Sequence, residues 1–192
     1  MAKVIYLTGA PASGKSSTTR LLAERVPDLL VWEYGARLTE HVRTRSAAVN
    51  DQTDLRSRSA EVVTPDDVVE VDRGLLAFVR AHRGERSILI DSHPVTKEAY
   101  GFRITAFPQD RIVELAPDEI WVLHADPLET RRRIGVDAGG RPMVSVEDAR
   151  RHADLQAAVA ATYGVLVGCP VHVFDAAVPR DDLVARLAGR LS

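Results

Sequence analysis

Eight residues close to the N-terminus constrain the fold of this chain more than any others. Positions 9–16 read Gly-Ala-Pro-Ala-Ser-Gly-Lys-Ser, which fits the pattern G-x-x-x-x-G-K-[ST] of a phosphate-binding P-loop. An apolar run at 4–8 precedes the pattern, and residues with helical spacing at 15–26 follow it. This context matters because a P-loop wraps backbone N–H groups around a phosphate at the start of a helix. The sequence therefore predicts a nucleotide phosphate site.

Each residue type in this loop has a physical role. Gly14 lets the backbone curl, and the helix that follows adds its positive N-terminal end. Lys15 is expected to reach the β and γ phosphates, and the Ser16 hydroxyl to ligate Mg²⁺. Lys15 is informative because only three of the 25 basic residues are lysines. ATP and Mg²⁺ are thus the expected donor and cofactor, held by Gly9, Ala12, Ser13, Gly14, Lys15, Ser16 and Ser17.

The rest of the chain alternates between short apolar runs and segments with helical spacing. Five runs read as buried strands, at 4–8, 29–34, 87–91, 119–124 and 171–174. Helices are expected at 15–26, 127–134, 146–167 and 180–191. This order predicts an α/β fold, a five-stranded parallel sheet covered by helices on both faces with right-handed crossovers.

Two stretches interrupt the regular β–α repeat. Residues 35–85 hold two or more helices and no good strand, so we expect a substrate-binding insertion there. Residues 135–143 are polar and glycine-rich between two helices, which favours a short mobile lid over an ordinary surface turn. The 192-residue length fits one domain that carries both features.

Composition excludes several classes of function. A formal net charge of −2 argues against a general nucleic-acid binder. The single cysteine, Cys169, permits no intrachain disulfide and no cysteine metal cluster. The N-terminus lacks the long apolar segment of a secretory signal, so a cytoplasmic location is expected. Residues 155–174 carry no charge, but Gly168 and Pro170 indicate a helix followed by a strand, and no membrane partner is expected.

Further charged residues are placed where phosphoryl transfer needs them. Asp91 ends the third strand, where a carboxylate holds Mg²⁺ or orients the acceptor of the phosphoryl group. Arg133, on the helix before the lid, and Arg141, within the lid, are the arginines we expect to stabilise the transferred charge. Arg131 and Arg132 are expected on a solvated helix face, because consecutive helical residues point about 100° apart.

The acceptor side is expected to use the insertion. Tyr34 and Gly35 open it, and Arg56 within it is suited to grip an acceptor phosphate through two hydrogen bonds. His93 follows Asp91 closely and is either a substrate contact or an ordinary hydrogen-bonded loop histidine.

At these residues the sequence resembles the P-loop nucleoside monophosphate kinases, above all the archaeal-type adenylate kinases, over nearly the whole chain. The resemblance rests on the P-loop, Tyr34-Gly35, the run 51–56 ending in Arg56, Ile90-Asp91-Ser92-His93, Gly101-Phe102 with Pro108, Ala125-Asp126-Pro127, Arg133 with Asp137, and Tyr163-Gly-Val-Leu-Val-Gly168. It implies a five-stranded sheet with a nucleoside-monophosphate-binding insertion and a lid. It also implies that Arg56, His93 and the loop 101–108, including Arg103, face the acceptor.

The reaction that the resemblance implies is conversion of ATP and AMP into two ADP with Mg²⁺, and the relatives often form homo-oligomers. Two further hypotheses stay open. Ala157 stands where an arginine is expected in the archaeal enzymes, and the loop 101–108 is longer than theirs, so the acceptor of an ATP-dependent kinase here is alternatively a small-molecule hydroxyl. The few lid arginines favour, as a third reading, a nucleotide-binding regulatory module with little transfer.

Overall fold

The computed structural model describes residues 1–45, 49–136 and 143–191, without the side chains at 56, 57, 59 and 60. The strands are β1 (Val4–Gly9), β2 (Leu30–Glu33), β3 (Ile88–Asp91), β4 (Val95–Glu98), β5 (Gly101–Ile104), β6 (Glu119–His124) and β7 (Val171–Asp175). The helices are α1 (Lys15–Arg25), α2 (Tyr34–Arg45), α3 (Gln52–Val62), α4 (Pro65–His82), α5 (Gln109–Leu115), α6 (Pro127–Val136), α7 (Val146–Val167) and α8 (Arg180–Leu191).

The main sheet has five parallel strands in the order β2-β3-β1-β6-β7, which confirms the predicted architecture. β1 is the central strand. The chain next forms the edge strand β2, returns to place β3 between β2 and β1, and then adds β6 and β7 on the other side. Ligands of such open sheets bind beyond the carboxyl ends of the strands, at the point where the order reverses. The loop after β1 therefore lies at the expected ligand position.

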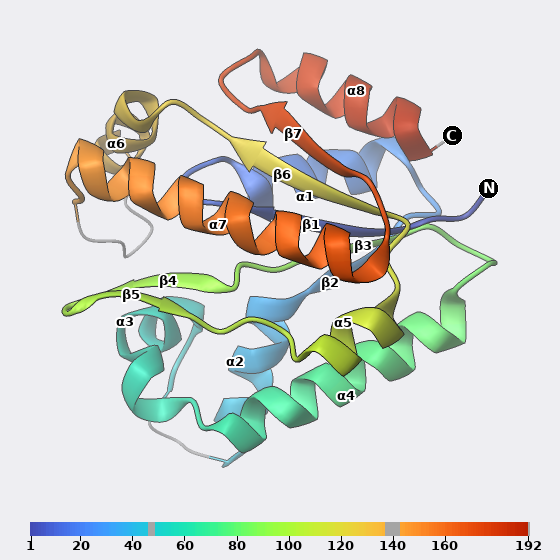
Figure 1. The fold of residues 1–192 in the computed structure, drawn as a ribbon, viewed down its shortest axis with the longest axis horizontal. Helices are drawn as coiled ribbons and strands as arrows, with labels where there is room; N and C mark the ends of the chain where they lie inside the picture. The colour runs from blue at the N-terminus through green and yellow to red at the C-terminus, as the bar shows by residue number, and fades with distance from the viewer. Residues whose placement is uncertain (46–48, 137–142, 192) are drawn as a thin grey trace.

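Helices cover both faces of the sheet, with α7 on one face and α1 and α8 on the other (Figure 1). Successive residues of β1 contribute to different cores, because side chains alternate across a strand. Tyr6 packs with Leu75 of α4 and Tyr163 of α7, whereas Leu7 packs with Leu22 of α1 and Leu187 of α8. Burial on both faces explains why the strands read as continuous apolar runs.

The insertion between β2 and β3 holds α2, α3 and α4, which lie below the sheet in Figure 1. Its small core includes Val42, Val49 and Leu55. α4 begins with a capping box, in which Thr64 and Asp67 bond each other's backbone N–H groups. One predicted boundary was wrong: Tyr34 begins α2 and does not end the strand.

Three elements, β4, β5 and α5, were not expected from the sequence. β4 and β5 form an antiparallel hairpin, and β5 begins the stretch 101–108 that the sequence indicated as a loop; α5 follows it. The hairpin lies beside α7 in Figure 1, and the buried His152 of α7 bonds the Val95 carbonyl at 3.0 Å. The side-chain bond fixes the hairpin against the core. Across the described ranges, none of the helices has the length and apolarity needed to span a membrane.

Candidate active site

The loop after β1 has the backbone shape that its sequence predicts. Gly14 is left-handed, with φ of 86°, and it caps α1 at Lys15. The Ser13 N–H donates to the Ala10 carbonyl at 3.2 Å, which closes the turn before the helix begins. The N–H groups of the first helical turn have no partner inside the helix, and they supply the positive end that attracts phosphate.

Lys15 lies against Asp91, which is the second predicted catalytic residue. The Lys15 Nζ is 3.1 Å from the Asp91 Oδ1, and both side chains are largely buried, at 13% and 11% exposure. β1 and β3 are neighbours with Leu7 opposite Asp91, so the register places Asp91 beside the end of β1, from which the loop leads to Lys15 at the start of α1. The pair places an ammonium group and a carboxylate at the carboxyl edge of the central strands.

Two arginines approach the loop through its carbonyl groups. Arg133 of α6 donates to Glu129 at 2.7 Å, to the Ala176 carbonyl at 2.9 Å and to the Ala12 carbonyl at 3.4 Å. Arg180 of α8 donates to the Gly14 carbonyl at 2.8 Å and to the Thr18 hydroxyl at 2.6 Å. Burial, followed by the charge of Arg133, lowers the pKa of Arg180. Both side chains thus hold the loop in its shape.

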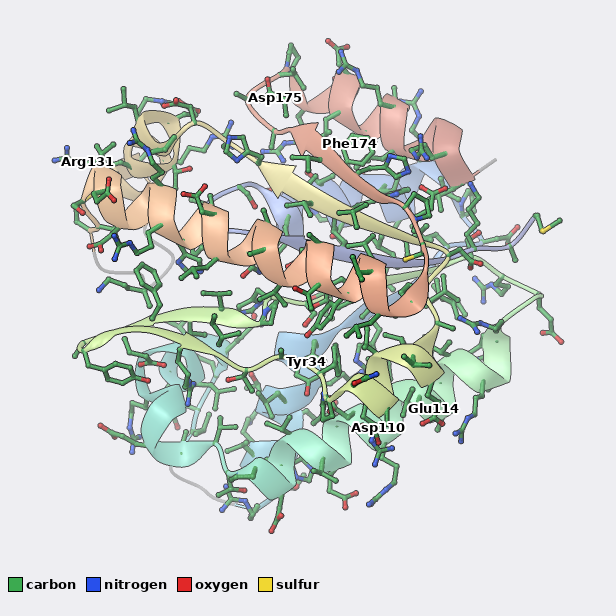
Figure 2. All side chains as sticks on the ribbon, in the orientation of Figure 1. Tyr34, Asp110, Glu114, Arg131, Phe174 and Asp175 are labelled. Carbon is green, nitrogen blue, oxygen red and sulfur yellow. The ribbon has the colours of Figure 1, made fainter. Side chains whose placement is uncertain are left out.

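The other arginines near the lid are placed differently. Arg131 and Arg132 are exposed, as the sequence predicted, and Figure 2 shows Arg131 at the edge of the molecule beside α6. Arg132 pairs with Glu129. Arg141, the predicted lid arginine, lies outside the described residues, as do positions 137–142.

One cavity of about 990 Å³ extends from the loop to the insertion. This volume is at the upper end of the range for ligand sites, about 300–1,000 Å³. Its lining contains both donor-side and acceptor-side residues of the prediction, namely Gly9, Lys15, Ser16, Tyr34, Gly35, His93 and Arg103. A continuous cleft therefore connects the phosphate loop with the helices expected to hold a second substrate.

The acceptor side of this cavity has an apolar wall with one buried acid. The Tyr34 hydroxyl donates to the Asp72 Oδ1 at 2.7 Å, which ties α2 to α4. Burial raises the pKa of Asp72, while the Tyr34 hydrogen bond and the charge of Arg111 act in the opposite direction. Figure 2 shows Tyr34 where the sheet meets the helices below it, and its ring packs edge-on against Phe107 at 5.8 Å.

The hairpin forms the wall next to α7. Arg103 of β5 pairs with Glu98 of β4 at 3.2 Å, and both side chains line the cavity. Lys97 lies over the Phe102 ring, with its Nζ 5.2 Å from the ring centre. Burial lowers the pKa of His152, which keeps a neutral imidazole against the hairpin.

The remaining predicted residues lie in the loop, on the surface of α1 and on α3. Ala12, Ser13 and Gly14 form the loop, and Ser17 is exposed on α1. Arg56 belongs to α3, but its side chain is outside the description. Sequence reasoning missed Asp72 and Arg180. Asp72 carried a signal, because it is an acid on the apolar face of α4, whereas Arg180 is one arginine among many at a helix start.

The donor set fits a nucleotide with its magnesium ion. Lys15 supplies the ammonium for phosphate oxygens, and the Ser16 hydroxyl and the Asp91 carboxylate are hard oxygen ligands of the kind that Mg²⁺ prefers. Within the described ranges, no cluster of three or more His, Cys, Asp or Glu side chains is suited to a metal. The nucleotide's own phosphates supply the other ligands in sites of this type.

Comparison with known proteins supports this description. A family model described as an AAA domain matches residues 8–150, which is more than half of the chain. An adenylate kinase of Methanoculleus marisnigri is 26% identical over 179 residues, covering 90% of this chain and 89% of the relative. An adenylate kinase of Pyrococcus abyssi is 28% identical over 167 residues, covering 86% and 82%. The predicted resemblance is thus confirmed.

Among solved structures, an unliganded sugar kinase from Janibacter sp. HTCC2649 is similar to the chain with a TM-score of 0.55. The two are 14% identical, and the match covers 98% of this chain and 94% of the other. At that identity the likeness concerns the fold alone. Together with the loop geometry and the sheet order, the family match shows that the chain belongs to the AAA-domain family and has the P-loop kinase fold.

Proposed function

We propose that this protein is an ATP- and Mg²⁺-dependent kinase that transfers a phosphoryl group to a nucleoside monophosphate, with AMP as the first candidate. The observation that carries the proposal is the single cavity that joins Lys15 and Ser16 to the helices of the insertion. Relatives named adenylate kinase, aligned over most of both chains, support AMP.

The chain's own residues supply binding and charge stabilisation. Lys15 and the amides of the loop neutralise charge on the donor phosphates, and Asp91 pairs with Lys15, which lines the cavity. Bound Mg²⁺, held by Ser16 and Asp91, would neutralise the developing phosphate charge. An acceptor phosphate is already a nucleophile, so the reaction needs no covalent intermediate on the protein.

An acceptor screen tests the proposal. ADP formation is measured in a coupled assay with ATP, Mg²⁺ and each of AMP, CMP, UMP, GMP and dTMP. We expect turnover that depends on the acceptor and is fastest with AMP. Folded protein that binds ATP but turns over none of the five would contradict the proposal.

A second candidate has its own support. The acceptor side of the cavity is largely apolar, it contains the acid Asp72, and Arg103 is already paired with Glu98. Such a wall also suits an uncharged acceptor hydroxyl, for which Asp91 would be the base. Diadenosine pentaphosphate, which spans both nucleotide sites of an AMP-dependent enzyme, separates the two. Tight inhibition favours AMP, and its absence together with ATP-dependent phosphorylation of a small-molecule hydroxyl favours the second candidate.

A further inference from the structure

Asp72 occupies a position on α4 where an apolar residue is expected. It is 4% exposed, and residues one turn along the same face, Leu75 and Leu76, are buried in the core. A carboxylate in such a place costs free energy unless a partner or a function compensates for it. The residues of α4 that line the cavity are Pro65, Val68, Val69 and Asp72, so Asp72 lies where the cavity meets the core.

In the described part of the chain, one of the two carboxylate oxygens of Asp72 accepts a hydrogen bond. Its Oδ1 accepts the hydrogen bond from Tyr34, and in the described part of the chain Oδ2 accepts none. Oδ2 is not one of the fully buried polar atoms that lack a partner, so this oxygen keeps some accessible surface. Asp72 also lines the cavity. A carboxylate oxygen with free acceptor capacity therefore faces the space where a ligand would lie.

The surroundings of this oxygen suit a flat ring. The Tyr34 and Phe107 rings pack edge-on at 5.8 Å, and the apolar side chains of Leu38, Leu55 and Val68 also line the cavity. Tyr34 directly follows Glu33, which is paired in register with Asp91 on the neighbouring strand. Tyr34 thus connects the transfer end of the cavity, at its backbone, with Asp72, at its hydroxyl.

We propose that Asp72 is a specificity-determining residue, whose free oxygen accepts a hydrogen bond from an amino group on the base of the acceptor nucleotide. The inference rests on the proposed function and extends it. The N6 amine of adenine donates to a carboxylate, whereas a carbonyl oxygen at the same place, as in hypoxanthine, presents a second acceptor and is repelled. Tyr34 is a positioning residue that orients Asp72.

The test compares AMP with IMP, which carry an amine and a carbonyl oxygen respectively at position 6 of the base, the hypoxanthine of IMP also having a proton on N1. We measure kcat/KM for both acceptors in the wild-type protein and in Asp72→Asn, whose amide can turn an N–H toward a carbonyl. The wild-type protein is expected to prefer AMP by roughly 10- to 100-fold, and the variant to lower that ratio at least about tenfold. Glu70→Gln, on the exposed face of α4 and paired with Arg73, is the matched control and leaves the ratio unchanged.

The outcomes separate the inference from the function on which it rests. Equal use of AMP and IMP by the wild-type protein overturns the inference, and this measurement does not depend on whether Asp72→Asn folds. An unchanged AMP-to-IMP ratio in a folded Asp72→Asn also overturns it, because a purely structural Tyr34–Asp72 bond would alter stability and not the ratio. No turnover on any nucleoside monophosphate overturns the proposed function together with the inference.

Discussion

At the scale of single residues, the Lys15–Asp91 pair is the centre of the proposed chemistry. Both residues were predicted from sequence because their neighbourhoods are local: a loop pattern for Lys15 and a strand end for Asp91. Their 3.1 Å contact depends on the register between β1 and β3. Local sequence patterns thus identified the two residues, whereas the pairing of the strands places them close together.

Lys15→Ala is expected to lower kcat/KM for phosphoryl transfer by at least about 10²- to 10³-fold, as loss of a group that stabilises transition-state charge does in other enzymes. The coupled assay measures this. Lys3→Ala is the matched control, because Lys3 also pairs with a carboxylate, Glu119 at 2.9 Å, but at the opposite end of the sheet. The control should lower the melting temperature and keep kcat. Full activity in Lys15→Ala would contradict the assigned role.

The contacts of arginine side chains were harder to predict from sequence. An arginine side chain is long, so its guanidinium contacts groups that only the tertiary fold brings near it. Arg133 was predicted to contact the transferred phosphoryl group. In the structure it bonds Glu129 and the carbonyls of Ala12 and Ala176, so its contact with the loop is through the backbone. Contact between Arg133 and a phosphate stays a prediction.

At the scale of elements, α8 acts on the donor site through one side chain. Arg180, at the first position of α8, bonds the Gly14 carbonyl and the Thr18 hydroxyl. A Cβ at Gly14 would clash with the Arg180 guanidinium, so the arginine in this position requires a glycine at 14. The C-terminal helix therefore contributes to the shape of a loop more than 160 residues earlier.

Removal of this contact should weaken donor binding. Arg180→Ala loses two hydrogen bonds from a charged donor, each worth about 1.5–3 kcal/mol at most, and we expect KM for ATP to rise about tenfold or more. KM for the acceptor should change less. Arg186→Ala, an exposed arginine on the same helix, is the control. An unchanged KM for ATP in Arg180→Ala would show that the loop keeps its shape without the arginine.

The elements that sequence did not reveal are short and depend on tertiary contacts. β4 and β5 have four residues each, as β2 and β3 do, but they mix polar and apolar residues and are only partly buried, so no continuous apolar run marks them. Their pairing is fixed from outside by the bond between His152 and the Val95 carbonyl. α5 has seven residues, shorter than the window over which helical periodicity is read. The buried strands of the main sheet and the four helices predicted beside them, by contrast, agree with the structure to within a few residues.

At the scale of the whole molecule, Glu119 joins the N-terminus, the sheet and the C-terminal helix. It accepts from Lys3 at 2.9 Å, from Trp121 at 2.8 Å and from Arg190 at 2.9 Å. Burial alone would raise its pKa, but the hydrogen bonds from Arg190, Trp121 and Lys3 outweigh burial and lower the pKa to about 2. The folded state therefore favours the ionised carboxylate.

This lowered pKa predicts how stability depends on pH. Because the folded pKa is below the ordinary value of 4.5, the stabilisation is present above about pH 5 and is lost as pH falls toward 2. Its size is at most about 3 kcal/mol. Chemical denaturation of the wild-type protein and of Glu119→Gln should differ at pH 7 and converge toward pH 2–3. A difference that is constant with pH would contradict the assignment.

In the proposed function, the cavity between the P-loop and the insertion is where the γ-phosphoryl group of ATP passes to AMP. Phosphorus NMR of a mixture of protein, ATP, AMP and Mg²⁺ tests it most directly. We predict that ATP and AMP disappear together in equal amounts while two equivalents of ADP form, without release of inorganic phosphate. Conversion of ATP into ADP and phosphate, with AMP unchanged, would contradict the claim.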